Sequence, residues 1–287
     1  MHWFAFSLIS IFALAVAELT QQHLLNLKNP LSPRTSGVLT FLTQSIFAFP
    51  IIFLMGLSGQ ILSPFHLAVV IPIITVAFVA SVAMIFYFKS FQVKNISFST
   101  ILISLSVVVS TTLGIIVFGE GTNFLKFLGI VLIMLAIVSV NIKNLNIEKN
   151  HYFGLIAGIM FGVSYTIDKF IVRSVHPIIY IAWTFALIAL FGFLLNPKEV
   201  ISEIKVRKLN DYRPIVISAI GYLIFNFATL TAYTVGGEVG KVDAINNSQI
   251  FLIILFEYFI LRHTAGVKRK IITALIAVTG VMILGLL

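Results

Sequence analysis

The stretch FHLAVVIPIITVAFVASVAMIFYF at 65–88 runs for 24 residues without an Asp, Glu, Lys or Arg. A helix that crosses the roughly 30 Å hydrocarbon core of a bilayer needs about 20 mostly apolar residues. Nine further stretches along the chain have similar length and character. The ten predicted spans are 3–24, 36–57, 65–88, 97–118, 124–142, 152–173, 177–195, 213–234, 242–261 and 269–287. The sequence therefore predicts an all-α membrane protein with ten transmembrane helices.

The composition agrees with this class and excludes others. Hydrophobic residues make up 59% of the 287 residues and charged residues only 10%, and the mean hydropathy is +1.08. Soluble domains usually carry about 25% charged residues. The net charge of +9 comes from basic residues at helix ends and loops, where they meet lipid headgroups, so it does not indicate nucleic-acid binding. With no Cys and no close pair of His, we expect no metal and no cofactor.

The basic residues are distributed unevenly between the two sides of the membrane. Let side A be the side where the N-terminus starts, and side B the other. Fifteen of the 19 Lys and Arg residues fall on side B. The four on side A are Lys126, Lys169, Arg173 and Lys241. Because cytoplasmic loops carry the excess of Lys and Arg, the pattern predicts a multi-pass protein of the cell membrane with side B in the cytoplasm and both termini outside.

The two halves of the chain, 1–147 and 148–287, carry related patterns. The first half begins with Trp3-Phe4 and reaches an acid at Glu18, and the second begins with Tyr152-Phe153 and reaches an acid at Asp168. The offsets agree within one residue. Since five spans is an odd number, a second copy of the unit enters the membrane upside down. The pattern thus predicts two inverted five-helix repeats, an architecture of secondary transporters.

Four stretches carry a resemblance to a known family. They are FYFKSFQVKNISFSTILISLS (86–106), FGEGTNFLKFLGIVLIMLAIVSV (118–140), AYTVGGEVGKVDAINNSQIFLIILFEYFIL (232–261) and KRKIITALIAVTGVMIL (268–284). The chain resembles the EamA-type ten-helix members of the drug/metabolite transporter superfamily over essentially its whole length. Glu120 and Gly129 stand at the spacing of that family's "gE…G" signature. The resemblance implies a ten-helix secondary transporter.

The chain departs from the family pattern in three places. His263-Thr264 stand where the family usually has a turn glutamate, and the proline common in the fourth and ninth helices is absent from both. The charge count also puts the termini outside, whereas relatives are often drawn with them inside. For Glu120, at the turn before the fifth span, we expect a cap on the start of that helix, where its charge meets the helix dipole.

Three carboxyls inside the predicted spans are candidate functional groups, because an ionisable group in the bilayer is costly and tends to be kept for function. Glu18 and Glu257 lean toward side B, and Asp168 leans toward side A. Acids that flank the midplane from opposite sides suit alternating access about a central site. Glu257 stands among apolar residues with no close basic neighbour, which suits a proton carrier.

Each acid also has a structural interpretation. Glu18 is followed by polar residues at 20–23, which would fit a hydrated helix end. Asp168 adjoins Lys169 and would fit a structural ion pair at the interface. Glu257 would fit a protonated acid that is hydrogen-bonded to another helix.

Neutral polar and aromatic side chains extend the candidate site. The ninth span opens with the polar residues Asp243, Asn246, Asn247, Ser248 and Gln249. So many polar groups entering a membrane helix indicate a cavity wall, to which Asn246, Asn247, Gln249 and, from the eighth span, Asn226 would contribute. Tyr165 and Trp183 would stack on a solute. The alternative for the amides is hydrogen bonding between helices, and for the aromatic residues it is packing.

These features favour a secondary transporter that moves a small polar or amphipathic metabolite or drug by alternating access, with proton coupling as its driving force. The expected partners are the solute, protons and the lipid bilayer. An intramembrane enzyme is one alternative, but the chain has no GxGD or GxSxG motif, no metal cluster and no P-loop. A non-transporting membrane scaffold is the other alternative, in which the acids inside the spans would be an unneeded cost.

Overall fold

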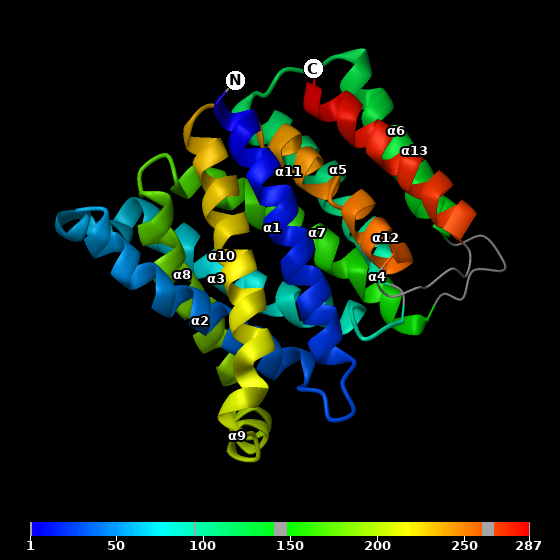
Figure 1. Ribbon diagram of the computed structural model, residues 1–287. Helices are drawn as coiled ribbons and strands as arrows, with labels where there is room; N and C mark the ends of the chain where they lie inside the picture. Colours follow the sequence, from blue (N-terminus) through cyan, green and yellow to red (C-terminus); the bar gives the residue numbers. More distant parts are fainter. Residues whose placement is uncertain (1, 95, 141–147, 260–266, 287) are drawn as a thin grey trace.

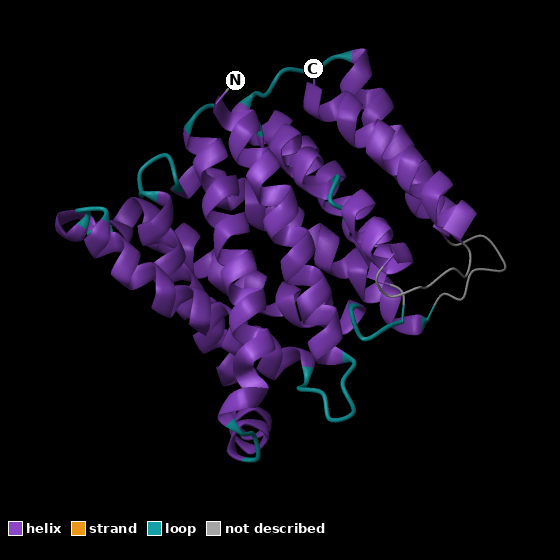
Figure 2. Cartoon of the chain, viewed as in Figure 1, coloured by secondary structure: helices purple, strands orange, loops and turns teal. Residues whose placement is uncertain are grey.

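The computed structural model describes residues 2–94, 96–140, 148–259 and 267–286, and this part of the chain is built of helices and loops (Figure 2). Six of its long helices are α1 (His2–Leu25), α2 (Pro33–Leu54), α3 (Leu67–Ser90), α7 (Phe153–Ile171), α8 (Pro177–Leu195) and α10 (Arg213–Thr234). Two spans are divided into the pairs α4 (Ile96–Ile103) with α5 (Leu105–Phe118) and α11 (Val239–Asn247) with α12 (Ile250–Phe259). The remaining helices are α6 (Phe124–Val140), α9 (Pro197–Lys205), α13 (Val267–Leu286) and the short 3₁₀ turns Ser58–Gln60, Ser63–Phe65, Lys149–Tyr152 and Leu209–Tyr212.

Eight helical segments of the described chain are long and apolar enough to cross a membrane. They coincide with eight of the predicted spans, so these eight predictions are confirmed at the level of length and composition. The other two predicted spans, 124–142 and 269–287, overlap α6 and α13. Their described apolar stretches, Phe124–Ala136 and Ile271–Gly280, are shorter.

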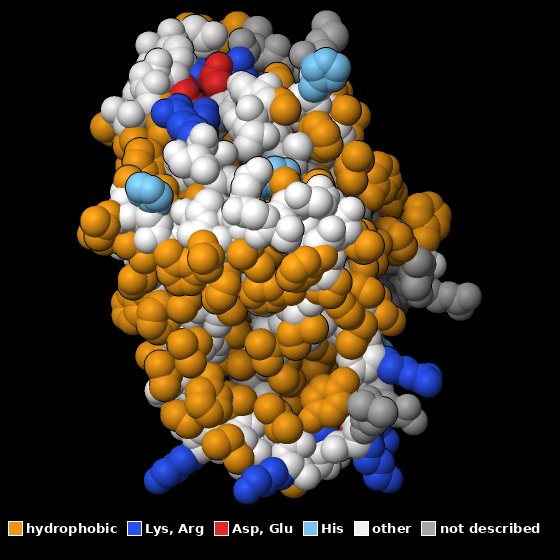
Figure 3. Space-filling view, turned by 90° about the vertical axis from the view of Figure 1, so that its left-hand side faces the viewer, with side chains coloured by type: hydrophobic (Ala, Val, Ile, Leu, Met, Phe, Trp, Pro, Cys, Tyr) orange, Lys and Arg blue, Asp and Glu red, His pale blue; other side chains and the backbone are white. Residues whose placement is uncertain are grey.

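Large apolar side chains are exposed on the outer surface of the bundle, as in a protein surrounded by lipid. Phe12, Ile46 and Ile71 are 63%, 56% and 66% exposed, whereas a soluble protein would seldom expose so many large apolar side chains together. Figure 3 shows one face on which apolar side chains cover the middle, with Lys and Arg at the lower edge and a mixed acidic and basic cluster near the top. We therefore describe the chain as a multi-pass membrane protein.

Local sequence signals explain where several helices begin and end. The Ser32 hydroxyl accepts a hydrogen bond from the backbone N–H of Thr35 at 3.2 Å, and Pro33 follows as the first residue of α2. His176 and Pro177 start α8 in the same way. A cap satisfies an N–H that the helix itself cannot, and proline fits the first turn because its N–H is not needed there. At the end of α5, Gly119 has a φ of 64°, in the left-handed region that favours glycine.

The fourth and ninth spans are each interrupted near their middle, although neither contains a proline. In the fourth span the break lies at Ser104, where the Val107 N–H donates to the Ser104 carbonyl at 3.0 Å. In the ninth it lies at Ser248 and Gln249, and the Phe251 N–H donates to the Ser248 carbonyl at 3.2 Å. These are bonds to the third preceding residue, which characterise 3₁₀ rather than α geometry. Backbone groups of this kind are tolerated at membrane depth where protein or a cavity surrounds them.

Helices from the two halves of the chain pack against one another. α1 packs against α10, α2 against α8, α3 against α7, and α6 against α13. Figure 1 shows α6 and α13 side by side along one edge of the bundle, and shows that α13 ends at the same end of the bundle as α1 begins. This arrangement agrees with the prediction that both termini lie on the same side of the membrane.

Small residues allow the closest of these contacts. A Cβ on Gly158 would lie 2.7 Å from the carbonyl oxygen of Ile103, and one on Gly162 would lie 2.8 Å from that of Ser106. Both distances are far below van der Waals contact, so α7 approaches the α4–α5 break only because these positions lack a side chain. The close approach places Ser106 beside the residues of α7 and α11 that line the cavity described below.

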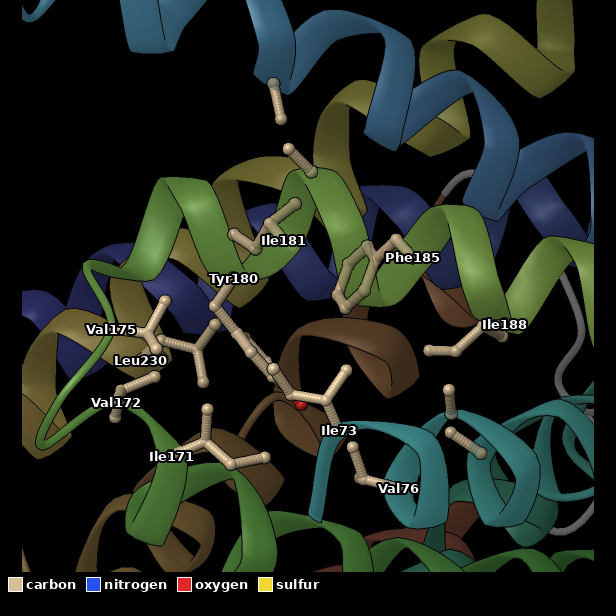
Figure 4. Close-up of a cluster of buried hydrophobic side chains, with 14 of the residues drawn as sticks. Ile73, Val76, Ile171, Val172, Val175, Tyr180, Ile181, Phe185, Ile188 and Leu230 are labelled. Atoms are coloured by element: carbon tan, nitrogen blue, oxygen red, sulfur yellow. The ribbon is translucent and has the colours of Figure 1, made fainter. Parts of the chain in front are cut away.

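The largest core cluster lies between α3, α7, α8 and α10. Figure 4 shows Ile73 of α3, Ile171 of α7 and Leu230 of α10 around the ring of Tyr180 from α8. Tyr180 is 1% exposed. This packing holds the tyrosine rigidly, so its hydroxyl has a fixed place beside Asp168.

On side B, α9 ties two loops together. Glu199 of α9 forms an ion pair with Arg34 at the start of α2, and the Glu203 carboxylate accepts the backbone N–H of Ser32 at 3.0 Å. In Figure 1, α9 lies at the lower end of the bundle, beyond the ends of the long helices.

Candidate functional site

A cavity lies where α1, α3, α7, α8, α10 and α11 come together. About 80 Å³ of it is open to the centres of water-sized molecules. At about 10–15 Å³ for each water in this measure, it has room for roughly five to eight waters or one small solute. The polar part of its wall consists of Glu18, Tyr87, Ser106, Ser164, Tyr165, Asp168, Tyr180, Tyr222, Asn226, Asp243, Asn246, Asn247 and Gln249.

The first acid of the cavity is Glu18, on the inner face of α1. It is 1% exposed. Its carboxylate accepts hydrogen bonds from the hydroxyl of Tyr87 on α3 and, at 3.4 Å, from that of Thr100 on α4. Glu18 is therefore a buried carboxyl held by neutral donors, and the interpretation as a hydrated helix end does not describe it.

The second acid is Asp168, one turn before the end of α7. Its carboxylate accepts a hydrogen bond from the hydroxyl of Tyr180 on α8. The neighbouring Lys169 points elsewhere, because its Nζ donates to Glu120 Oε1 at 2.8 Å. The sequence suggested an ion pair between Lys169 and Asp168, but Lys169 pairs with Glu120 instead.

The third acid is Asp243, on α11. It is 1% exposed. Its two oxygens accept hydrogen bonds from the hydroxyl of Ser110 at 2.8 Å, the hydroxyl of Ser106 at 3.3 Å and the amide of Asn247 at 2.8 Å. The close packing of α11 on α5, where a Cβ on Gly240 would lie 2.9 Å from the Cα of Thr111, brings the two serines to this carboxylate.

The side chains that donate hydrogen bonds to these three acids are all neutral. Among the described residues, the ion pairs involve Glu120, Glu199 and Glu238 and lie outside the cavity, and no described Lys or Arg lines it. A buried carboxylate without a cationic partner is costly because its desolvation is not repaid. Groups of His, Cys, Asp and Glu that could hold a metal are absent from the described chain. The arrangement suits a site in which a proton or a bound cation supplies the positive charge that balances the carboxylates.

Amide side chains complete one side of the cavity. Asn246 accepts a hydrogen bond from the hydroxyl of Ser10 and donates to the Thr229 hydroxyl at 3.0 Å. Asn226 donates to Gln44 Oε1 at 3.0 Å. These bonds also join helices, as the structural interpretation expected, so the same amides both hold the bundle together and line the cavity. Gln249 is different, because its buried Oε1 atom has no hydrogen-bond partner.

Four tyrosines surround the acids. Tyr165 of α7 lines the cavity together with Glu18, Asp168 and Asp243, and its ring stacks on that of Phe161, with centroids 6.0 Å apart and planes within 12°. The other three tyrosines face the acids from other helices, and they are Tyr87, Tyr180 and Tyr222.

Two predicted site residues lie elsewhere or outside the described side chains. The indole N–H of Trp183 donates to the carbonyl of Ile61 at 2.9 Å, and its ring contacts those of Phe49 and Phe65. Trp183 therefore fastens the loop after α2 to α8 instead of lining the cavity. The backbone of Glu257 belongs to α12, but its side chain lies outside the described residues, as do His263 and Thr264.

An ionic cluster lies on side A, above the cavity. Glu120 accepts the backbone N–H of Val239 at 2.8 Å as well as Lys169, so it caps α11. The start of α6 is capped by Asn123, whose side chain accepts the N–H of Lys126 at 2.7 Å. The expectation that Glu120 caps the fifth span is therefore wrong. The chain turn at Gly119 directs its carboxylate back toward α7 and α11, where Gly114 leaves room for it.

The cluster continues through Glu238, the residue before α11. Its carboxylate pairs with Lys126 at 2.6 Å and with Lys241 at 3.0 Å. Partial burial alone would raise the pKa of Glu238, but the hydrogen bonds and charges of the two lysines outweigh it and leave this pKa below its ordinary value. Together with Lys169, three of the four basic residues on side A are thus paired with one of two carboxylates.

Sequence reasoning located most of the cavity but missed some of its most important groups. Asp243 was grouped with the polar opening of the ninth span instead of with the acids, because it stands near the predicted start of that span. The serines that bind it and the tyrosines that donate to Glu18 and Asp168 carried no separate signal. In a chain with 8 Tyr and 27 Phe, single aromatic residues in spans do not stand out from packing residues.

Comparison with known proteins bears directly on this arrangement. A sequence profile of the EamA-like transporter family matches residues 1–142 and 149–286. An uncharacterized transporter of Methanothermobacter thermautotrophicus (strain Delta H) is 31% identical over 141 residues, which cover 45% of this chain. This match spans 40% of that relative's own length.

One solved crystal structure of a protein is similar over 98% of this chain and 96% of its own, with a TM-score of 0.65 and 12% sequence identity. At such low identity the similarity concerns the fold alone. The family profile, by contrast, covers nearly the whole chain and bears out the resemblance found in its four sequence stretches. The chain is a multi-pass membrane protein that belongs to the EamA-like transporter family, within the drug/metabolite transporter superfamily.

Proposed function

We propose that this protein is a secondary transporter of the cell membrane, which moves a small polar or amphipathic solute by alternating access about the central cavity. The observation that carries the proposal is the presence of three carboxyls, Glu18, Asp168 and Asp243, in one buried cavity with only neutral partners. Ionisable groups at membrane depth mark solute and ion pathways. In a non-transporting scaffold, these buried carboxyls would destabilise the protein without serving a function.

The packing of the helices supports an inverted repeat of two five-helix units and ten crossing helices. Let α1, α2, α3, α4–α5 and α6 correspond to α7, α8, α10, α11–α12 and α13. The contact of α1 with α10 then has its counterpart in that of α7 with α3, and the contact of α5 with α7 has its counterpart in that of α11 with α1. The pairs α2–α8 and α6–α13 are each their own counterpart.

Two further features follow the same correspondence. The breaks at Ser104 and Ser248 fall in the fourth helix of each unit, and Glu18 and Asp168 fall in the first helix of each. The two matches to the family profile, 1–142 and 149–286, cover the two units separately. Discontinuous helices at the junction of inverted repeats hold the solute site in many transporters, and here the break residue Gln249 lines the cavity.

The side A ionic cluster supports a conformation that is closed on that side. Glu120 links the end of α5 to α7 through Lys169 and to α11 through the Val239 N–H. Because these three helices also line the cavity, opening toward side A would require these contacts to separate. The small number of basic residues on side A and the fifteen on side B support a cytoplasmic side B.

Proton coupling is part of the proposal. A carboxyl that alternates between a neutral and an ionised form can carry a proton across the cycle, and the hydroxyls of Tyr87, Tyr180 and Ser110 can donate to the ionised form. Glu257 remains a candidate for the same role through its sequence context.

Cysteine accessibility tests alternating access directly, because the chain has no Cys of its own. Ser164→Cys places a thiol on the cavity wall at a side chain that is 3% exposed. We expect a membrane-impermeant thiol reagent to label it slowly both in right-side-out and in inside-out vesicles. Thr75→Cys, on the exposed face of α3, is the matched control and should resist the reagent from both sides.

The same experiment separates the alternatives. Labelling of Ser164→Cys from one side only, or from neither, would contradict alternating access and favour a scaffold. Rapid labelling from both sides at once, with unselective leak of ions through reconstituted vesicles, would favour a channel. Accumulation of a labelled solute by proteoliposomes that hold the purified protein would complete the case for transport.

A further inference from the structure

We propose that the cavity binds the ammonium group of a small amphipathic organic cation, an inference that rests on the proposed transport function and names its substrate class. The ammonium would lie among the three carboxyls and against the ring of Tyr165. Its apolar part would lie along the aromatic and aliphatic wall.

The charge of the cavity wall disfavours anionic solutes. Glu18, Asp168 and Asp243 supply acidic groups, and the described part of the lining contains no Lys or Arg. An anionic solute would bring its charge beside these acids without a compensating group, which is the arrangement by which sites reject a wrong partner. A cation would instead supply the charge that the hydrogen-bonding partners of the acids do not have.

An independent feature of the cavity also calls for a hydrogen-bond donor. Gln249 is 3% exposed, it lies at the break between α11 and α12, and it lines the cavity. Its Oε1 is buried and has no partner. A buried acceptor without a donor costs free energy, and an ammonium N–H supplies the donor it lacks. A carboxylate or phosphate ligand would bring further acceptors.

The remaining wall fits the apolar part of such a solute. Tyr165 lines the same cavity as all three acids, and aromatic faces attract ammonium groups, more strongly when water is excluded. The apolar lining includes Leu14, Phe41, Phe88 and Phe185. The volume has room for a solute of about the size of five to eight waters, which indicates a small amine.

A matched set of three probes tests the charge requirement. Benzylammonium, benzyl alcohol and benzoate have the same ring and nearly the same size but carry a positive, zero and negative charge. We expect benzylammonium to raise the melting temperature of the purified protein in detergent in proportion to its concentration, because it binds the folded state. Benzyl alcohol should have a weaker effect and benzoate none. Stabilisation by benzoate alone, or by none of the three, would overturn the inference.

Variants locate the binding within the cavity. Asp168→Asn keeps the shape of the side chain and can still accept the Tyr180 hydroxyl, and Gln249→Leu removes the acceptor that has no partner. Each should weaken benzylammonium binding, measured by titration calorimetry, by about tenfold to a hundredfold, the range of a charge-assisted hydrogen bond. Asp211→Asn, at an exposed acid outside the cavity, should leave it unchanged. Unaltered affinity in both cavity variants would show that the cation binds elsewhere and would contradict the inference.

Failure of the inference and failure of the proposed function give different results. Benzylammonium that binds with the expected variant effects, but never crosses the membrane of a proteoliposome, would support the inference and contradict transport. Transport of another solute, unaffected by excess benzylammonium, would support the function and contradict the inference. Because Asn and Leu variants that fail to fold would report nothing, each variant is first checked for the monodisperse elution of the parent protein.

Discussion

The ion pair between Lys169 and Glu120 should contribute far more to stability than the similar pair between Lys126 and Glu238. The Lys169 and Glu120 side chains are only 10% and 5% exposed, whereas Glu238 is 29% exposed and keeps Lys241 as a second partner. Lys169→Met leaves the Glu120 carboxylate buried with one backbone N–H as donor. Breaking a buried pair in this way costs about 3–5 kcal/mol. Lys126→Met should cost about 0–1 kcal/mol, as for a partly exposed pair.

The free energy of unfolding can be measured in mixed micelles by titration with a denaturing detergent, followed by the fluorescence of the two tryptophans. The double variant Lys169→Met/Glu120→Gln removes both charges and should recover most of the loss, because no buried charge is left alone. The reasoning would be refuted if Lys169→Met were no more destabilising than Lys126→Met. It would also be refuted if the double variant lost as much stability as the two single variants together.

Four further outcomes are expected. Gly158→Ala should destabilise the protein by about 1–3 kcal/mol in the same titration, since its Cβ would lie 2.7 Å from a backbone oxygen of Ile103. Glu238→Gln should lower the melting temperature at neutral pH. Because the folded pKa of Glu238 lies below its ordinary value of 4.5, its contribution is complete above that pH, and the difference from the parent should vanish as the pH falls through the folded pKa. Lys205→Cys should resist impermeant thiol reagents in intact cells, because side B is predicted to be cytoplasmic. Glu257→Gln should abolish solute accumulation driven by a pH gradient but retain solute exchange, if this carboxyl carries the proton.

Each of these outcomes has a control or a contrary result. Gly59→Ala, where a Cβ meets nothing within 4 Å, should change stability little, and an equal loss there would contradict the packing argument. A pH-independent effect of Glu238→Gln would show that its charge is not what matters. Ready labelling at position 205 would reverse the orientation. Full gradient-driven uptake by the Glu257→Gln protein would assign coupling to the cavity acids.

The sequence predicts the positions of the helices well, because apolar runs of about 20 residues have few other uses. Of the nine candidate residues, seven line one cavity, because polar groups inside such runs need a reason, whereas Trp183 lies elsewhere and the Glu257 side chain lies outside the described residues. Asp243 escaped notice because it stands close to a helix start, where acids are ordinary. Trp183 was misjudged because a packing indole and a binding indole have the same sequence context. The partners of Lys169 and Asp168 depend on the rotation of α7 about its own axis, which the local sequence does not predict.

The breaks in the fourth and ninth spans differ in kind from breaks made by proline. Proline has no backbone N–H, so a helix interrupted by it cannot be repaired. Ser104 and Ser248 keep theirs, and the interruption includes one bond to the third preceding residue in the fourth span and three such bonds in the ninth. Such a segment has every backbone N–H that α geometry needs, so its covalent structure allows conversion to α geometry and back. The rise per residue falls from about 2.0 to about 1.5 Å in the conversion, so three residues that convert draw the two flanking helices about 1.5 Å closer along their common axis. In each half, the interrupted helix beside the cavity is therefore not held in its broken form by the covalent structure of the chain.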